Sequence, residues 1–352
     1  SLVETLERQI QLADAEEQNP LKLQLAEVLF RNMKGHSEAV SVLSEIVQEE
    51  RSHEGAISLL EEILDENIQV LQTVLLLEPH YRATSQWSAL FGARLALLDH
   101  LESKEERFSL LNEISHIALE EMEDNDAAFT VLCQAFVERP EDAEVREQIG
   151  GLADQLNSHN NLVEIIRSVL ESQELEDELA AELGEQLARI YNEKLKDTEK
   201  ATTWYEYVLE RNGETPAILA ALEILYSQQE RWEELTAIML RQSESTTSDS
   251  NQAAIFYRQG QIYRDQLKDV DSAGDAFQRA LDADPTHVET FNALETLLVD
   301  GGQTEALLAL YEQQSNQLSE DSLRAEIFSK MATLYHYTDE ASEQAVELWH
   351  RV

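Results

Sequence analysis

The sequence is poor in residues that end helices or cross-link a chain. Its 352 residues include 5 prolines, 11 glycines and a single cysteine, Cys133. One cysteine excludes an internal disulfide, and the apolar neighbours in AAFTVLCQAF predict a buried, inert thiol. No apolar run is long enough to cross a bilayer, so we expect a soluble chain without membrane insertion. A reducing compartment is compatible with this composition, which slightly favours the cytoplasm and leaves periplasmic or secreted locations open.

Basic residues are also scarce. The chain has 26 of them against 70 acidic residues, a net charge of −44. Nucleic-acid binding requires the opposite sign of charge, and an anionic membrane surface would repel the chain. From residue 120 to 185 we count 19 acidic and three basic residues. Two interpretations remain open for this acidity: a solvated surface suited to solubility or a saline habitat, or attraction of a basic partner.

The patterns of catalytic and metal-binding chemistry are missing as well. We find no glycine-rich phosphate loop, no serine in a nucleophile elbow and no histidines at metal-ligand spacing, so we predict no catalytic residues, cofactor or metal. Asp269, Asp271 and Gly274 imitate the start of a calcium loop, whose fifth and twelfth positions are oxygen ligands. Those positions hold Ala273 and Ala280. We therefore expect the two aspartates to cap and charge the start of a helix instead.

What the chain has in abundance is helix-forming sequence with a repeat. Ala, Leu, Glu and Gln dominate, and 43% of residues are apolar and recur periodically, which predicts an all-α protein. Four segments, starting near residues 106, 179, 253 and 324, each contain a helical run, a short acidic turn and a second helical run. Another helix pair separates each from the next. The repeating unit is therefore a pair of about 36 residues, in two alternating types.

One of these segments resembles the tetratricopeptide repeat family. The residues that carry the resemblance are Phe256, Gly260, Tyr263, Ala273, Phe277, Ala280 and Pro285. The turn between Tyr263 and Ala273 is one residue longer than is usual in that family. The resemblance is strongest in 253–285, 179–212 and 324–352, as in long acidic arrays of the bacterial type. The intervening pairs match poorly, with Glu223 and Glu295 where a small residue belongs.

This resemblance implies an α-solenoid of stacked antiparallel helix pairs that form a right-handed superhelix. A single pair cannot bury its own apolar face, so neighbouring pairs must stack. We expect Gly260 and Ala273 to let two helices approach closely, and Tyr263 and Phe277 to fill the core between pairs. We divide the chain into degenerate helix pairs at 1–104, with an irregular insertion near 64–85, and a regular, continuous array at 105–352. Half-pairs at both ends suggest a fragment of a longer array.

The resemblance also implies a non-enzymatic scaffold for protein–protein interactions, whose partner peptide or protein lies in a concave groove lined by the first helix of each pair. A basic partner would suit the charge. An alternative is a structural subunit that stacks with copies of itself or with fixed neighbours. The candidate groove residues are Glu182, Glu185, Arg189, Asn192, Tyr257, Gln261, Arg264, Thr333 and His336.

Overall fold

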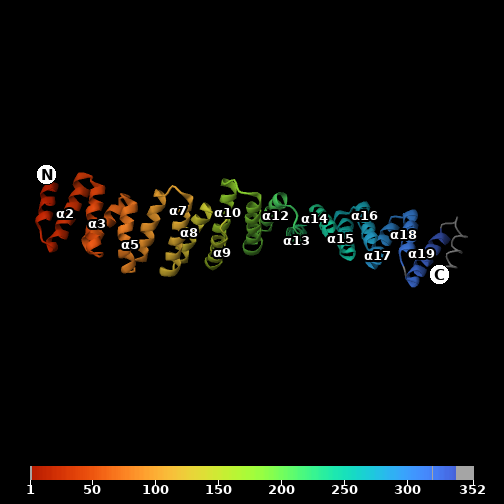
Figure 1. The fold of residues 1–352 in the computed structure, drawn as a ribbon. Helices are drawn as coiled ribbons and strands as arrows, with labels where there is room; N and C mark the ends of the chain where they lie inside the picture. Colours follow the sequence, from red (N-terminus) through yellow and green to blue (C-terminus); the bar gives the residue numbers. More distant parts are fainter. Residues whose placement is uncertain (1, 319, 338–352) are drawn as a thin grey trace. The chain divides into compact units, whose positions relative to one another are not determined.

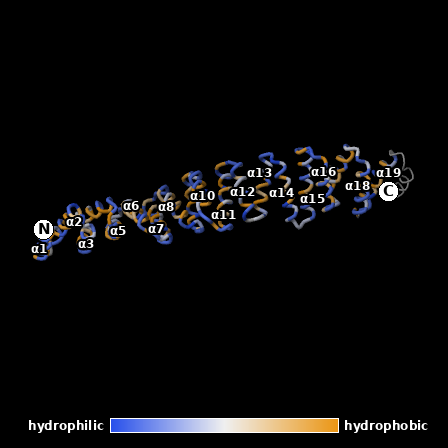
Figure 2. Tube along the Cα trace, turned by 90° about the horizontal axis from the view of Figure 1, so that it is seen from above, coloured by the Kyte–Doolittle hydropathy of each residue, from blue (hydrophilic) through white to orange (hydrophobic). Residues whose placement is uncertain are grey.

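The computed structural model describes residues 2–318 and 320–337, and in these ranges all regular structure is helical (Figure 1). This confirms the predicted all-α array of stacked helix pairs. The chain divides into two compact units, Ser1–Leu175 and Glu176–Val352. In both units, hydrophobic and hydrophilic residues alternate along the helices, as expected when one face of each helix is buried (Figure 2). No helix in the described ranges is long and apolar enough to span a membrane.

The first unit contains ten α-helices in the ranges described. They are α1 (Leu2–Leu12), α2 (Ala15–Met33), α3 (His36–Glu49), α4 (Glu54–Asp65), α5 (Val70–Ala83), α6 (Trp87–Leu97), α7 (Lys104–His116), α8 (Asn125–Glu138), α9 (Ala143–Leu156) and α10 (His159–Ser172). A 3₁₀ turn, Leu98–His100, follows α6. Helices that are consecutive in the chain pack side by side, which gives the unit its order.

The second unit has the same organisation. Its helices are α11 (Asp177–Arg189), α12 (Thr198–Asn212), α13 (Pro216–Gln228), α14 (Trp232–Ser245), α15 (Asp249–Ile262), α16 (Val270–Ala283), α17 (Val288–Asp300), α18 (Thr304–Gln317) and α19 (Asp321–Tyr337). We call the first helix of each pair helix A and the second helix B. In this unit α11, α13, α15, α17 and α19 are helices A, and α12, α14, α16 and α18 are helices B.

The extra residue in the regular repeats is absorbed by a wider helical turn. Helices α7, α11 and α15 each continue into a π-helical turn, at Ile117–Glu121, Ile190–Leu195 and Tyr263–Leu267. A π turn accommodates one inserted residue without breaking the helix. The turns then close in the same way: the amide of Asp197 donates to the carbonyl of Tyr191, and that of Asp269 to Tyr263, both at 2.9 Å.

The acidic turns between helices A and B are helix caps. Glu123, Lys196 and Lys268 have left-handed backbone conformations, and an aspartate follows each of them. The Asp269 carboxylate accepts a hydrogen bond from the amide of Ser272 at 3.0 Å. Asp124 and Asp197 cap α8 and α12 in the same way. The prediction that Asp269 caps a helix is therefore confirmed.

The close approach predicted at Gly260 is present. A Cβ atom added there would lie 2.6 Å from the ring of Phe277, which is completely buried. In α11 the equivalent of Gly260 is the fully buried Ala188, and Gly184, one turn earlier, makes a further close approach, since a Cβ added there would lie 2.9 Å from Val208. Ala273 is also fully buried. Small residues at these positions thus bring helix A against helix B, as the repeat pattern predicts.

Tyr263 is less buried than the expected place in the core between pairs implies. Its side chain packs against the core around Phe277 but remains partly exposed. Tyr191, at the equivalent place in α11, is 4% exposed, and the Lys200 ammonium lies 5.2 Å from its ring centre. The residue equivalent to Lys200, 72 positions later, is Ser272. A serine is too short to cover the ring, which explains the difference.

One type of polar contact occurs in both the N-terminal region and the regular array. The Tyr81 hydroxyl donates to Glu61 at 3.1 Å, and the Tyr226 hydroxyl donates to Glu206 at 2.8 Å. The two pairs are offset by 145 residues, about four helix pairs. The region near 64–85, where we expect an irregular insertion, contains the end of α4 and the whole of α5. The single thiol, Cys133, is 7% exposed, so the prediction of a buried thiol is confirmed, and burial raises its pKa to about 11.

Candidate partner-binding face

Four of the predicted groove residues lie along one side of α11 and its π turn. Glu182 and Arg189 are exposed, and Glu185 and Asn192 are half-buried. Their spacing of three and four residues places them on one helix face. Burial raises the pKa of the nearby Tyr205, and the charges of Glu185 and Arg189 act on that pKa in opposite directions. Arg189 forms no ion pair with any residue that the structure describes.

Tyr257 and Gln261 of α15 are hydrogen-bonded to each other, and Arg264 lies in the π turn that follows α15. Tyr257 is half-buried, and its ring lies 5.9 Å from that of Phe277 and 5.3 Å from that of His287. The Gln261 amide donates to the Tyr257 hydroxyl at 3.0 Å. The Arg264 guanidinium donates twice to the Asp265 carboxylate, at 2.8 and 2.9 Å. An arginine held in this way presents a fixed geometry to the surface.

The last two candidates, Thr333 and His336, are exposed near the end of α19. The Thr333 hydroxyl donates to the Ser329 carbonyl one turn earlier, at 2.8 Å. The predicted residues therefore belong to α11, α15 and α19, which are alternate helices A, and to the π turns that follow α11 and α15. Helices α13 and α17 intervene in the chain, so the predicted set covers only part of any face that the helices A share.

The intervening helices A add residues that the repeat pattern did not supply. Glu223 and Glu295 occupy equivalent positions, 35 residues after the small residues Ala188 and Gly260 of the preceding units (223 − 188 and 295 − 260). When the helices are aligned on these glutamates, Ile224 of α13 and Thr296 of α17 occupy the position of Arg189 and of Gln261. Asn292 of α17 occupies the position of Tyr257. Ile224 is 58% exposed. The signal was the spacing, which holds even where the motif residues are replaced.

Glu223 shows what replaces the small residue in the intervening pairs. Its carboxylate is mostly covered and accepts hydrogen bonds from Gln242 of α14, at 2.9 Å, and Arg258 of α15, at 2.6 Å. One carboxylate thus joins helix A, its own helix B and the next helix A. This half-buried carboxylate therefore has two hydrogen-bond donors, and its bond to Arg258 is also an ion pair.

The next intervening pair repeats this arrangement 72 residues later. The Glu295 carboxylate accepts from the Tyr311 hydroxyl of α18 at 2.5 Å and from the Lys330 ammonium of α19 at 2.9 Å. Together with the contact between Tyr257 and His287, these bonds connect α13 to α15, α15 to the start of α17, and α17 to α19. Four helices A are therefore linked in sequence by their own side chains.

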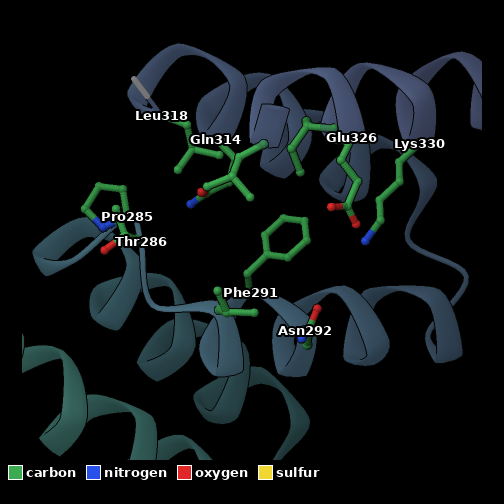
Figure 3. Close-up of a pocket in the computed structure, with 11 residues that line it drawn as sticks. Pro285, Thr286, Phe291, Asn292, Gln314, Leu318, Glu326 and Lys330 are labelled. Atoms are coloured by element: carbon green, nitrogen blue, oxygen red, sulfur yellow. The ribbon is translucent and has the colours of Figure 1, made fainter. Parts of the chain in front are cut away.

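A pocket lies where α17 begins, α18 ends and α19 begins (Figure 3). Its volume is about 90 Å³. The apolar part of its wall consists of Val288, Phe291, Leu318, Leu323 and Ile327. Its polar groups include Gln314 of α18 and Glu326 and Lys330 of α19. Among the described residues, no cluster of His, Cys, Asp or Glu is placed to hold a metal ion.

Comparison with known proteins finds one family match, to a single repeat unit of the chain. The family model described as tetratricopeptide repeat matches residues 253–287, and no curated protein matches the chain. The chain is similar to solved structures of three repeat proteins. YrrB, a TPR protein with an unusual peptide-binding site, is 14% identical with a TM-score of 0.31, covering 52% of this chain and 90% of YrrB.

The other two are larger matches. A tetratricopeptide repeat protein from Parabacteroides merdae is 17% identical, with a TM-score of 0.31, 69% of this chain covered and 98% of that protein. The C-terminal part of a TPR protein from Cytophaga hutchinsonii is 14% identical, with a TM-score of 0.31 and coverages of 69% and 93%. Likeness at this level says nothing about what the chain binds. The family match falls on the same residues that carry the sequence resemblance, so residues 253–287 match a tetratricopeptide repeat.

Proposed function

We propose that the chain is a non-enzymatic scaffold that binds a peptide or protein along the face formed by its helices A. Tetratricopeptide repeats are typical of protein–protein interaction, and the match at 253–287 supports that broad role. The observation that carries the proposal for this face is the chain of contacts through Glu223, Tyr257 and Glu295. Side chains held by neighbouring helices lose little entropy on binding, so they suit recognition of an extended segment.

The chemistry of the face indicates what such a segment would contain. Arg189 is exposed and unpaired within the described ranges, although acidic residues outnumber basic ones by 70 to 26. An unpaired guanidinium can donate hydrogen bonds to a carboxylate or a backbone carbonyl of a partner. Glu185, one turn earlier on the same helix face, would attract a lysine or arginine. A partner segment with basic residues therefore suits the charge of the face and of the whole chain.

The alternative, a structural subunit that stacks through another surface, is favoured by one observation. The helix-B side of the first unit has an open apolar groove between α8 and α10. Phe129, Cys133, Val137 and Ile165 line it, and Val137 is 40% exposed. Exposed apolar surface of this kind is a common feature of assembly interfaces.

Selection of peptides on the intact chain would test the proposal. A phage-displayed dodecapeptide library would be selected on the wild type, and enriched peptides would be synthesised and titrated. Enriched peptides should carry basic residues, and their affinity should fall with Arg189→Ala or Tyr257→Ala. Failure of any peptide to enrich, together with a concentration-dependent increase in mass that Val137→Glu abolishes, would favour the stacking alternative instead.

A further inference from the structure

The pocket between α17, α18 and α19 is lined by a buried hydrogen-bond donor that has no acceptor in the part of the chain that the structure describes. Gln314 is 1% exposed, and its Nε2 atom has no hydrogen-bond partner among the described residues. In Figure 3, Gln314 and Phe291 face the same space from different helices. Buried amides are nearly always paired in folded proteins, because an unmade hydrogen bond is costly. The exception at Gln314 therefore requires an explanation.

Comparison within the chain shows how the donor became free. Gln242 lies 72 residues before Gln314, at the same position of helix B, and its Nε2 donates to Glu223 at 2.9 Å. The equivalent carboxylate, Glu295, is already occupied by the Tyr311 hydroxyl and the Lys330 ammonium. The residue that precedes Gln242 by three is Met239, which cannot compete for the carboxylate in this way. Replacement of methionine by tyrosine thus leaves the Gln314 donor directed at the pocket.

From this we infer that the pocket is an anchor site for an aliphatic side chain of a bound peptide, whose backbone carbonyl accepts a hydrogen bond from Gln314. The inference rests on the proposed peptide-binding function. The volume of about 90 Å³ equals roughly three water molecules at about 30 Å³ each, which is the size of a branched aliphatic group. The walls of Phe291, Leu323 and Ile327 favour an apolar occupant, and the amide supplies the one polar contact that fixes its orientation.

The charged residues at the edge of the pocket favour a particular type of residue beside the aliphatic side chain of the peptide. Lys330 is engaged by Glu295, so its charge is compensated. Glu326 lines the same pocket from α19 and is exposed. Its carboxylate is available to a cation on the ligand, so a lysine or arginine beside the aliphatic residue fits the edge. The pocket would therefore take a pair such as Leu-Lys within an extended, basic segment.

Two short peptides would test this directly on the intact chain. N-acetyl-Leu-Lys-amide has the aliphatic anchor, and N-acetyl-Ser-Lys-amide has the same charge without it. Binding would be followed by ¹⁵N-resolved NMR, through the side-chain amide signal of Gln314, which is identified by its loss in Gln314→Leu. The leucine peptide should shift this signal with saturation in the millimolar range, and Gln314→Leu should weaken its binding about fivefold, the effect of one hydrogen bond.

Gln242→Leu is the matched control, because it removes the equivalent amide without touching the pocket. It should leave the affinity for the leucine peptide unchanged. The inference is overturned if the Gln314 signal does not move, if the serine peptide binds equally well, or if the two leucine variants behave alike. These failures are separable from failure of the proposed function, since library peptides that depend on Arg189 could still bind the chain when the pocket does not.

Discussion

Gly260→Ala tests whether the close contact between helices A and B holds the repeat together. The added Cβ would lie 2.6 Å from two atoms of the Phe277 ring, and that ring is completely buried. The ring is rigid and enclosed, so the helices must move apart to make room. Such overpacking costs about 1–3 kcal/mol of unfolding free energy. Alanine in a helix interior is more stable than glycine by about 0.5–1 kcal/mol. We therefore expect the free energy of unfolding to fall by up to about 2 kcal/mol.

Gly274→Ala separates the contact from the change in helix propensity. Gly274 lies inside α16 of the same unit, and an added Cβ there would meet only Leu297, at an ordinary contact distance of 3.5 Å. The propensity gain is shared by both variants, so their difference of about 1–3 kcal/mol measures the contact alone. Urea unfolding followed by circular dichroism would give both free energies. Equal stabilisation by the two alanines would refute the close packing of α15 against Phe277.

Three further outcomes follow from the charges and buried polar groups. Thermal stability should rise between low salt and about half-molar salt, because salt screens the repulsion within a chain of net charge −44; a flat or falling melting temperature would contradict this. Gln314→Leu should raise the unfolding free energy by about 1 kcal/mol, since it removes an unsatisfied donor, and Gln242→Leu should lower it by a similar amount, since Glu223 loses a partner. Burial opposes ionisation of Glu78, but hydrogen bonds from Arg94 and Arg82 prevail and lower its pKa below the ordinary 4.5. Its stabilising effect is therefore complete above that pH and lost as the pH falls through the folded value, and Glu78→Gln should flatten the acid side of a stability–pH curve.

The sequence was a good guide to the fold because the repeat is expressed in local chemistry. Helix-forming composition, the step of about 36 residues and the small residues at Gly260 and Ala273 predicted the stacked helix pairs. The extra residue after Tyr263 was visible in the sequence, but its accommodation by a π-helical turn was not. That outcome depends on backbone hydrogen bonds, which the repeat pattern does not encode.

The candidate face could be predicted only in part. The motif located candidates on α11, α15 and α19, where its residues are present, and passed over α13 and α17, where Glu223 and Glu295 replace the small residue. The orphaned amide of Gln314 was also beyond prediction. It depends on which donors reach Glu295, and the competition between Tyr311, Lys330 and Gln314 is decided by three-dimensional packing.

The central claim is that helices A bind the partner, and calorimetric titration of a library-selected peptide tests it most directly. Wild type would be compared with two variants: Arg189→Ala on α11, which is a helix A, and Arg241→Ala on α14, which is a helix B. Arg241 is paired with Glu214 at 3.3 Å. A hydrogen bond to a charged group contributes about 1.5–3 kcal/mol, so Arg189→Ala should weaken binding roughly tenfold or more. Arg241→Ala should leave the affinity unchanged. Equal affinities for wild type and Arg189→Ala, or a loss confined to Arg241→Ala, would contradict the account.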